Sequence, residues 1–453
     1  MNNHFKKILL LAGDVTAMYI ALFLTIALRY WQWPEAEIWQ AHLLPFTIIF
    51  AGWLVIFFIA DLYNLRQAAN SAKFFSKIGQ TFLFSALLSV LFFYFSPLTG
   101  ITPKTNLAIF VGVFFIIFSI WRVIFNAILS SYLPKNNIAI IGLSTLAEKL
   151  LMEIKQQPHL GFHISFILDE KRPDQKEING TPIFSAFKDL PELINRKKIS
   201  HIILAENPDS EKRRSLLFEC LHLKISFINL INFYETITGK VPIEAIGKMW
   251  FLENLNEGGQ NNADIFKKVV DIIGALIVLL ITIIFWPLII LVIKIESRGP
   301  AFFKQTRVGQ NGQEFKILKF RTMRTENNDS SPTVDGDKRI TALGNFLRKS
   351  RLDELPQILN ILKGEMSFVG PRPERPGLVT ELEKQIPFYS ERTLTKPGLT
   401  GVDQISGEYH SPSYEDTMKK LQYDLYYIKH RSLFLDFSII LKTIATVFLR
   451  AGR

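Results

Sequence analysis

Two adjacent carboxylates follow a run of cations in residues 348–357, which read RKSRLDELPQ. Asp353 and Glu354 are neighbours, so their charges repel each other, and on a helix their side chains would point in different directions. A helix start would explain them, because acidic side chains are favourable at the positive end of the helix macrodipole. The alternative is a site at which one carboxylate does chemistry while the arginines bind an anion. Both interpretations are compatible with the segment alone.

A second set of cations lies in residues 299–323, where cations alternate with phenylalanines. The segment GPAFFKQTRVGQNGQEFKILKFRTM reads as two short strands around the turn at Asn311 and Gly312. A solvated cationic face is one interpretation, and a basic patch held close to a membrane-facing apolar surface is the other. The cations of this segment are Lys304, Arg307, Lys316, Lys319 and Arg321.

The sequence GPRP at residues 370–373 predicts a rigid loop, because each proline fixes its own φ and restrains the residue before it. Such a loop could hold Arg372 in a set direction, as bidentate recognition of a phosphate requires. Glu365 and Glu374 lie on either side of the loop. Either could help to bind a metal ion, although surface positions are the simpler interpretation.

Composition narrows the class of protein. The 453 residues leave room for two or three domains, and 48% of them are hydrophobic. A formal net charge of +11 favours anionic partners, which are nucleic acid, lipid headgroups or a phosphorylated substrate. Cys220 is the only cysteine, which excludes an intramolecular disulfide framework and a multi-cysteine zinc site.

The elements that must position these residues begin with four apolar runs in the N-terminal third. A bilayer span needs roughly 20 apolar residues. The third run is short, and Asp14 and Arg122 interrupt the first and fourth; a hydrogen bond within the bundle is the commoner fate of such an acid. The positive-inside rule places both ends of this region in the cytoplasm, so we expect a four-helix transmembrane domain over residues 1–132. The runs are Ile8–Leu28, Leu43–Ala60, Thr81–Phe95 and Leu107–Leu129.

Residues 133–252 alternate strand-like and helix-like patterns, which predicts a parallel sheet in a Rossmann-like α/β cytoplasmic domain. The first strand ends at Gly142, and Ser144 and Ala147 follow where a dinucleotide-binding fingerprint has two further glycines. Those glycines let the backbone approach a pyrophosphate. We therefore interpret the domain as structural or regulatory, with nucleotide binding as the weaker alternative. The strand-like runs are residues 137–142, 162–168, 201–205 and 225–230.

Residues 266–295 form the most hydrophobic stretch of the chain. A straight helix of this length would span a bilayer. However, cations flank both ends, so the positive-inside rule gives no direction, and Pro287 would kink the helix. A re-entrant helix that breaks at Pro287 and a fifth transmembrane helix with a tolerated proline are equally compatible with these residues. Re-entry would keep the rest of the chain in the cytoplasm.

Several ordered blocks from about Ile265 to the end resemble the bacterial sugar transferase domain of the polyprenyl-phosphate hexose-1-phosphate transferases, the monotopic phosphoglycosyl transferases. With transmembrane helices and a Rossmann-like domain ahead of it, the chain resembles the large members that prime exopolysaccharide, capsule or O-antigen synthesis. The resemblance implies a C-terminal α/β catalytic domain over residues 263–453 with a re-entrant membrane helix. The blocks are GPAFFKQTRVG, KFRTM, LRKSRLDELPQ, MSFVGPRPE, KPGLTG and YDLYYIKHRS.

The resemblance also implies a reaction and a cofactor. Such enzymes transfer a sugar 1-phosphate from a UDP-sugar to undecaprenyl phosphate and release UMP, with Mg²⁺ as cofactor. Asp353 would attack the sugar-bearing phosphate and form a covalent phosphosugar intermediate. Glu354 would accept a proton from the polyprenyl phosphate or, with Asp353, help to arrange the metal. A carboxylate needs help from cations, because it is a weak nucleophile toward a phosphate diester anion until the charge repulsion is cancelled.

The same resemblance implies the remaining site residues and partners. Pro287 would mark the break in the membrane helix, where Trp286 stands in place of the family's serine. The expected partners are a UDP-sugar, undecaprenyl phosphate and membrane lipid, with no nucleic acid, and a homodimer is plausible. The expected location is the bacterial cytoplasmic (inner) membrane, multi-pass, with the catalytic domain facing the cytoplasm. The expected phosphate-binding residues are Arg348, Arg372, Lys319, Arg321, Lys304 and Arg307.

A different class of function is a catalytically silent membrane scaffold or a nucleotide-sensing regulator of polysaccharide assembly. Asp353, Glu354, Arg348 and Arg372 are all present, which argues against that alternative, because an inactive relative would be expected to lose some of them. A transporter would show polar residues along several spans and internal symmetry. Neither is evident in the sequence.

Overall fold

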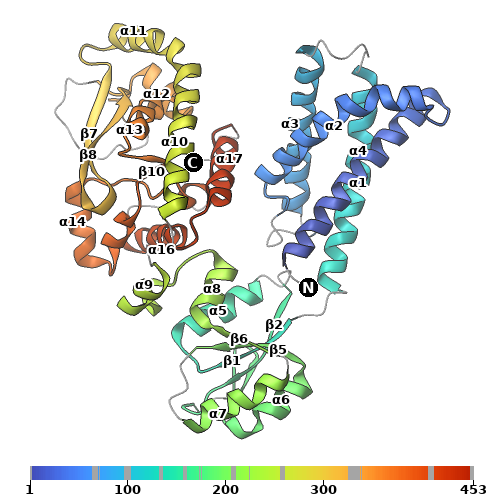
Figure 1. The fold of residues 1–453 in the computed structure, drawn as a ribbon, viewed down its shortest axis with the longest axis vertical. Coiled ribbons are helices and arrows are strands. Elements are labelled where there is room, and N and C mark those ends of the chain that lie inside the picture. The colour runs from blue at the N-terminus through green and yellow to red at the C-terminus, as the bar shows by residue number, and fades with distance from the viewer. Residues whose placement is uncertain are drawn as a thin grey trace. The chain divides into compact units, whose positions relative to one another are not determined.

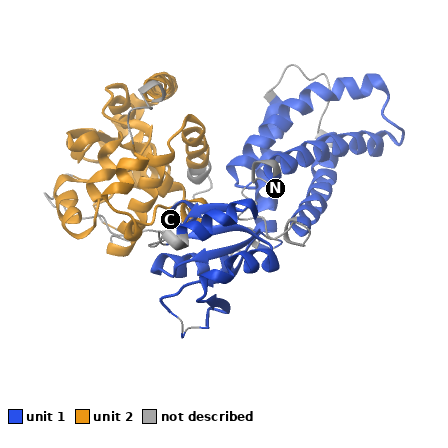
Figure 2. Ribbon diagram, turned by 60° about the horizontal axis from the view of Figure 1, so that its bottom comes forward, with its two compact units in different colours: residues 1–233 blue, residues 234–453 orange. Residues whose placement is uncertain are grey.

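The chain divides into two compact units, residues 1–233 and residues 234–453 (Figure 2). The computed structural model describes residues 3–63, 70, 72–95, 104–131, 136–156, 161–172, 174, 176–205, 211–223, 225–255, 261–324, 337, 339–406 and 413–448.

Long apolar helices open the N-terminal unit (Figure 1). By length and composition, each contains a stretch that could cross a membrane. The third helix begins at Ala72, so its membrane-length stretch, Phe74–Tyr94, is longer than the short apolar run expected from the sequence. The helices are α1 (Asn3–Tyr30), α2 (Ala36–Ile59), α3 (Ala72–Phe95) and α4 (Lys104–Ser131).

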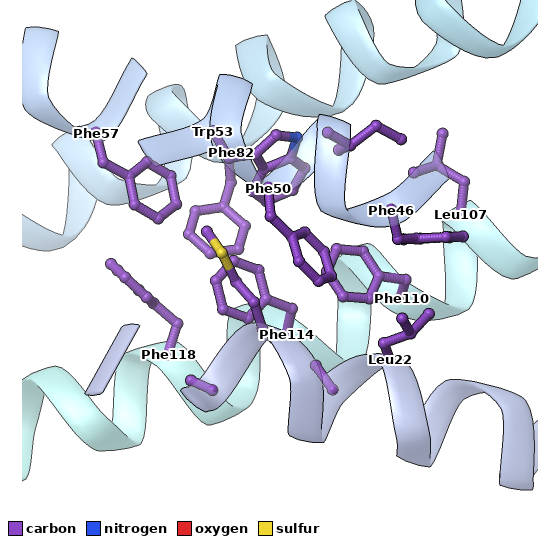
Figure 3. Close-up of a cluster of buried hydrophobic side chains, with 14 of the residues drawn as sticks. Leu22, Phe46, Phe50, Trp53, Phe57, Phe82, Leu107, Phe110, Phe114 and Phe118 are labelled. Carbon is purple, nitrogen blue, oxygen red and sulfur yellow. The ribbon is translucent and has the colours of Figure 1, made fainter. Parts of the chain in front are cut away.

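Aromatic rings fill the space between these helices (Figure 3). The rings of Phe82 on α3 and Phe114 on α4 lie 5.1 Å apart, centre to centre. Trp53 of α2 is buried beside them, and its Nε1 donates a hydrogen bond of 2.8 Å to Ser89 Oγ. Aromatic pairs at such distances stabilise a core beyond the burial of their area. The chain has 38 phenylalanines, and eight of them are buried in the cluster that packs these helices together.

A buried ion pair joins α1 to α4. Arg122 Nη2 donates a hydrogen bond of 2.6 Å to Asp14 Oδ2, and both side chains are at most 1% exposed. Arg122 Nη1 also donates to the Leu62 carbonyl at 2.7 Å. The two charges that interrupt the apolar runs thus compensate each other, as charges within membrane segments generally must. The expected hydrogen bond of Asp14 within the helices is confirmed.

A six-stranded sheet with the order β3-β4-β2-β1-β5-β6 follows in the same unit. β1 lies at its centre and pairs in parallel with β2 and β5, whereas β3 pairs antiparallel with β4. All four strand-like runs of the sequence form parallel strands, so the prediction of an α/β domain is confirmed. The elements are β1 (Asn136–Ile141), α5 (Thr145–Gln156), β2 (Phe162–Leu168), β3 (Glu177–Ile178), β4 (Thr181–Phe184), α6 (Leu190–Lys197), β5 (Ile199–Leu204), α7 (Glu211–Glu219) and β6 (Ser226–Asn229).

The turn after β1 differs from a glycine-rich phosphate loop. Gly142 has a φ of 84°, a conformation that glycine adopts without strain, and it leads the chain toward α5. Ser144 Oγ accepts a hydrogen bond of 3.3 Å from the Ala147 amide. Ser144 therefore takes the place of a helix N-cap, where serine is favoured because it satisfies a free amide of the first turn.

The C-terminal unit begins within helix α8 (Leu230–Thr238), earlier than the expected domain boundary at residue 252. Glu235 is buried, and its carboxylate lies 2.8 Å from Lys429 Nζ. On helix α9 (Lys248–Asn254), the Phe251 ring lies 4.8 Å from the ring of Phe388. Residues that the sequence pattern groups with the Rossmann-like domain thus pack against the C-terminal unit.

The most hydrophobic stretch folds as two helices that run in different directions, α10 (Asn261–Thr282) and α11 (Trp286–Glu296), joined by a 3₁₀ turn (Figure 1). Pro287 lies in the first turn of α11, where the absence of its N–H costs no helical hydrogen bond. The Trp286 ring lies 5.5 Å from that of Phe320, which fixes the break to the domain. Most large apolar side chains of the two helices are exposed.

A β-hairpin, a parallel strand pair and several helices complete this unit. Asn311 and Gly312 have φ values of 52° and 76°, so the expected turn between the two basic strands is confirmed. Ala275 of α10 packs with Phe315 of the hairpin and Ile358 in one hydrophobic cluster, which positions the hairpin beside the membrane helix. The elements are β7 (Phe302–Val308), β8 (Glu314–Phe320), α12 (Ala342–Lys349), α13 (Ile358–Leu362), β9 (Ser367–Val369), α14 (Pro376–Gln385), β10 (Gly398–Thr400), α15 (Val402–Ile405), α16 (Tyr414–His430) and α17 (Leu433–Phe448).

Candidate active site

The two carboxylates lie in a 3₁₀ helix, Leu352–Gln357 (η9), that follows α12. Arg351, just before it, has a φ of 58°, a left-handed conformation that ends the basic helix abruptly. A 3₁₀ helix has three residues per turn, so neighbouring side chains point about 120° apart. Asp353 and Glu354 are both buried and therefore face different neighbours.

Glu354 is held by two cations from distant parts of the chain. Its Oε1 accepts a hydrogen bond of 2.7 Å from Lys319 Nζ on β8 and one of 3.1 Å from Arg372 Nη2 in the GPRP loop. Burial alone would raise the pKa of Glu354, but the charges of Arg372 and Lys319 outweigh burial and bring the pKa well below its usual range. The lowered pKa favours the ionised form of Glu354, which the two cations hold in place.

Asp353 has a different environment. No described residue donates a hydrogen bond to its carboxylate, although the side chain is buried. Burial raises the pKa of Asp353 above its usual value, and the charge of Glu354 adds to this effect, while Lys319 and Arg348 oppose it. A carboxylate that is desolvated and held by no donor is more reactive as a nucleophile than one engaged in hydrogen bonds.

The loop that carries Arg372 is fixed from behind. Arg392 Nη2 donates a hydrogen bond of 2.9 Å to the Arg372 carbonyl and lies 2.8 Å from Asp424 on α16. Burial raises the pKa of Asp424 to about 6 although Arg392 opposes it. Arg392 therefore connects the backbone of the GPRP loop to α16 and limits where Arg372 can move.

Two glycines explain why the GPRP and KPGLTG blocks occur together. β9 and β10 pair in parallel, and the two blocks meet at their ends. A Cβ atom on Gly370 would lie 2.3 Å from the Lys396 carbonyl, and one on Gly398 would lie 2.1 Å from the Gly370 amide. Only glycine permits this approach of the two backbones.

Two other predicted phosphate-binding cations, Arg348 and Arg307, lie near these groups, and a third, Lys304, is on the hairpin. Arg348 Nε donates a hydrogen bond of 2.9 Å to Thr322 Oγ1, and its charge acts on Asp353. Arg307 Nη1 donates to the Pro373 carbonyl at 3.0 Å and so contacts the GPRP loop. Lys304 is exposed on β7, where it pairs with Leu318 across the hairpin. Their role in binding phosphate stays a prediction.

Arg321 occupies a different place from the other cations. Its Nη2 donates hydrogen bonds to the Ser297 carbonyl at 2.6 Å and to the Ile293 carbonyl at 3.3 Å. These carbonyls belong to the end of α11, where the last backbone acceptors of a helix need partners. Arg321 is 5% exposed, and through these hydrogen bonds it caps the end of α11. The alternation of cations along the strand could not distinguish this position from that of Lys319.

Three residues of this region were not predicted from the sequence. Arg351 is exposed, and its charge acts on both carboxylates. Arg392 supports the GPRP loop, and Asn360 binds the backbone of β8. Asn360 could have been noticed in the sequence, because it is the one amide within the apolar run ILNIL at residues 358–362.

Mg²⁺ typically takes one or two carboxylates and completes its coordination with substrate phosphates and water. Among the described residues, no group of three His, Cys, Asp or Glu side chains could hold a metal ion. Asp353 has a carboxylate without a competing donor, whereas Oε1 of Glu354 is already bound by two cations. These residues fit an ion that is carried mainly by a substrate diphosphate, with Asp353 as the available protein ligand.

Comparison with known proteins matches two parts of the chain to families. Residues 262–450 match the bacterial sugar transferase family, and residues 58–227 match a family described as a CoA-binding domain. By length and composition, five apolar stretches of the described chain could cross a membrane, and the fifth, Asp264–Glu296, folds as α10 and α11. Together with the bacterial relatives, these helices indicate a protein of the bacterial inner membrane.

Three relatives show how far the similarity extends. An N-acetylgalactosaminephosphotransferase of Aeromonas hydrophila that uses UDP-N-acetylgalactosamine and undecaprenyl phosphate is 38% identical over 51% of this chain and 54% of its own. A UDP-glucose:undecaprenyl-phosphate glucose-1-phosphate transferase of Klebsiella pneumoniae is 31% identical over 70% of this chain and 68% of its own. An exopolysaccharide production protein of Rhizobium leguminosarum is 39% identical over 41% of this chain and 96% of its own.

The matched region thus spans about half the length of the Aeromonas relative but nearly all of the Rhizobium relative. The family match includes η9, the basic hairpin and the GPRP loop, which together form the cluster around Glu354. On this evidence, the chain belongs to the bacterial sugar transferases, and within them to the large phosphoglycosyl transferases.

Proposed function

We propose that this protein transfers a sugar 1-phosphate from a UDP-sugar to undecaprenyl phosphate and releases UMP, thereby initiating exopolysaccharide, capsule or O-antigen synthesis. The names of its relatives support this reaction, since they include transferases of glucose 1-phosphate and of N-acetylgalactosamine phosphate to undecaprenyl phosphate. The observation that carries the proposal is the contrast between Asp353, which no described residue hydrogen-bonds, and Glu354, which two cations hold.

In the first step, a carboxylate oxygen of Asp353 attacks the sugar-bearing phosphorus of the UDP-sugar. The bond from that phosphorus to the bridging oxygen breaks, and UMP leaves with the electron pair. The product is a phosphosugar joined to Asp353. Lys319, Arg372 and Arg348 reduce the repulsion between the carboxylate and the diphosphate, because fixed positive charges stabilise the charge that develops on the phosphoryl oxygens.

In the second step, a phosphate oxygen of undecaprenyl phosphate attacks the same phosphorus and displaces Asp353. A phosphate monoester has a second pKa near 6, so this nucleophile is largely a dianion at neutral pH and needs no strong base. This agrees with the lowered pKa of Glu354, which makes it a poor proton acceptor. We therefore assign to Glu354 the task of orienting Lys319 and Arg372.

Mg²⁺, bound through the diphosphate beside Asp353, would supply positive charge that offsets the repulsion between the two anions. The division of the transfer into two steps lets a water-soluble donor and a lipid-bound acceptor use the site in turn.

The acceptor requires a site at the membrane surface. We propose that α10 and α11 enter and leave the same leaflet, with the break at Pro287, so that the catalytic domain stays in the cytoplasm. The different directions of the two helices and their exposed apolar side chains support this topology (Figure 1). The four helices α1–α4 would then cross the membrane and begin and end in the cytoplasm.

The test uses full-length protein in nanodiscs with Mg²⁺, undecaprenyl phosphate and a panel of UDP-sugars, with UMP release as the readout. We expect turnover with one or a few donors and its loss, by at least about 10³-fold, in Asp353→Asn, because the nucleophile is removed. With donor alone, the wild type should release about one equivalent of UMP and gain the mass of the phosphosugar.

Glu381→Gln on the exposed face of α14 is the matched control and should keep wild-type turnover. Turnover by Asp353→Asn near the wild-type rate would contradict the nucleophile assignment. Absence of UMP release with every donor, from folded protein beside a working relative, would favour the scaffold alternative.

A further inference from the structure

Asn360 is a fully buried amide among apolar neighbours. It is 0% exposed in α13, and Ile358 and Ile361 beside it are also buried. Its Oδ1 accepts a hydrogen bond of 3.1 Å from the Leu318 amide, and its Nδ2 donates one of 2.8 Å to the Lys316 carbonyl. Nδ2 also donates to Glu365 Oε2 at 2.7 Å. The amide thus uses both its donor hydrogens and its acceptor.

The first two hydrogen bonds reproduce the pairing of a neighbouring strand. β8 pairs with β7 on one side only, so the backbone groups on its other edge need partners. One amide side chain satisfies an N–H and a C=O two residues apart, as a strand would. An apolar side chain of the same size would leave both of these partly buried backbone groups without this partner, which is unfavourable.

The position of this contact links the two elements of the site. Asn360 follows η9, which carries Asp353 and Glu354, without a break in the helical backbone. Leu318 directly precedes Lys319, whose Nζ lies 2.7 Å from Glu354 Oε1. The Asn360 amide therefore fixes β8 to the helical segment close to both groups. The contact on β8 is one residue from Lys319, and Asn360 is six residues from Glu354.

We infer that Asn360 is a positioning residue that sets the distance between Lys319 and Glu354. It contacts no reacting atom; it holds the strand of the cation against the helix of the two acids. This inference rests on the proposed function, because it gives the Lys319–Glu354 contact a role in phosphoryl transfer. A misplacement of about 1 Å in such a site can reduce the rate about 10²-fold.

Chemical labelling tests the geometry independently of the reaction. Lys319 is 19% exposed at its side chain and bound to Glu354, so a lysine-acylating reagent should modify it slowly in the wild-type protein. In Asn360→Ala, mass spectrometry should show Lys319 modified at least about three times faster, because the cation is released from its partner. The exposed Lys304 on the same hairpin should react equally in both proteins. Unchanged labelling of Lys319 would overturn the inference whether or not the enzyme turns over.

Kinetics test the consequence. Asn360→Ala should lower kcat about 10- to 100-fold, with a smaller change in KM. In a Lys319→Met background the same substitution should cost less than about threefold, because residues that act through one another are not additive. Thr443→Val, which removes a partly buried hydroxyl contact to Thr400, is the control for general destabilisation and should behave additively with Lys319→Met. Additive losses for Asn360→Ala would assign it a purely structural role.

A rescue separates positioning from folding. Asn360→Asp keeps the acceptor for Leu318, but it loses the donor to the Lys316 carbonyl and places a second carboxylate against Glu365. Adding Glu365→Gln restores a donor for the contact with residue 365, so the double variant should gain at least about threefold in kcat over Asn360→Asp and show slower labelling of Lys319 than that single variant. Failure of the double variant to regain either, while it remains folded by its unfolding temperature, would contradict the proposed role.

Discussion

At the scale of single residues, the site separates two adjacent acids by their surroundings. Burial raises the pKa of Asp353, while the charges of Arg372 and Lys319 overcome burial at Glu354 and lower its pKa. A 3₁₀ turn makes this possible, because neighbouring side chains diverge by about 120°. Titratable neighbours whose environments push their pKa values apart commonly divide the roles in a reaction. In the proposed mechanism, Asp353 is the nucleophile and Glu354 is an anchor for the two cations.

The pH dependence follows from Asp353. Because its pKa is raised, the ionised form of the proposed nucleophile is lost as pH falls through a value above the usual pKa of aspartate. We expect the acid limb of kcat/KM at that higher pH. Arg351→Gly should move this limb to still higher pH, because Arg351 lowers the pKa of Asp353, and glycine keeps the left-handed backbone at this position.

The exposed Lys384→Met on α14 is the control for loss of one positive charge and should leave the limb in place. The measurement is the initial rate of UMP release in nanodiscs between about pH 4 and pH 8, from which the acid limb of kcat/KM is obtained for each protein. An acid limb that Arg351→Gly does not move would show that another group controls it.

The same pKa direction predicts a stability effect. A carboxyl whose pKa is higher in the folded than in the unfolded state stabilises the fold below its unfolded pKa, and this contribution is lost as pH rises through the folded pKa. At neutral pH, ionised Asp353 is therefore a cost to folding. Asp353→Asn should raise the unfolding temperature by about 2 °C or more while it abolishes turnover. Such a variant would be more stable and less active than the wild type.

The gain should shrink as the pH is lowered toward about 4, because the wild-type carboxyl becomes protonated as well. Glu354 has the opposite sign: its lowered pKa gives stability above the unfolded pKa that is lost at acid pH. Glu354→Gln should therefore lower the unfolding temperature at neutral pH. Equal unfolding temperatures for wild type and Asp353→Asn at pH 7 would contradict this account.

At the scale of elements, the break between α10 and α11 depends on contacts from the soluble domain. Trp286 packs on Phe320 at the start of α11, and Arg321 binds the carbonyls at its end. Glu296, the last residue of α11, accepts a hydrogen bond of 2.7 Å from the Ala342 amide at the start of α12. Consecutive residues of β8 and the segment after it thus hold both ends of this helix.

Arg321→Met tests whether that residue caps a helix or binds phosphate. Loss of the hydrogen bonds to Ser297 and Ile293 should destabilise the protein by about 1–3 kcal/mol, since the partly buried Ser297 carbonyl loses its donor and the Ile293 carbonyl keeps only the Ser297 amide. KM for the UDP-sugar should stay within about twofold of wild type. Lys304→Met removes an exposed cation from the same hairpin and should leave the unfolding temperature unchanged. A large rise in KM for Arg321→Met without destabilisation would restore the phosphate-binding assignment.

The elements also show where sequence patterns succeed and fail. Apolar periodicity and the Asn311–Gly312 turn report local structure, so the parallel strands and the hairpin could be predicted. The alternation of cations along β8 could not separate Lys319 from Arg321, because their partners lie 35 and 24 positions away in the chain. Asn360 was missed for the same reason, since its partners on β8 are 42 and 44 positions away.

At the scale of the whole molecule, the division at Phe233 separates residues that sequence patterns group together. The alternation of strands and helices continues through α8, so nothing in the local pattern marks a boundary there. The contacts of the folded chain mark the boundary. Glu235 binds Lys429, the Lys429 ammonium group lies 5.1 Å from the centre of the Trp250 ring, and Phe251 packs on Phe388. Residues 234–254 are therefore part of the folded C-terminal unit.

This arrangement predicts how the chain can be shortened. The Rhizobium relative matches over 194 residues that make up 96% of its length, so a protein of about this size can form a complete member of the family. Residues 234–453 of this chain should accordingly fold in nanodiscs and retain UMP release.

A fragment of residues 261–453 covers the family match but lacks Glu235 and Phe251, which contact Lys429 and Phe388. It should unfold at least about 4 °C lower, because it exposes Phe388 and leaves Lys429 without Glu235 and Trp250. Glu235→Gln in the longer fragment should give part of that loss. Equal stability of the two fragments would show that residues 234–254 contribute nothing to the C-terminal unit and would return the boundary to residue 252.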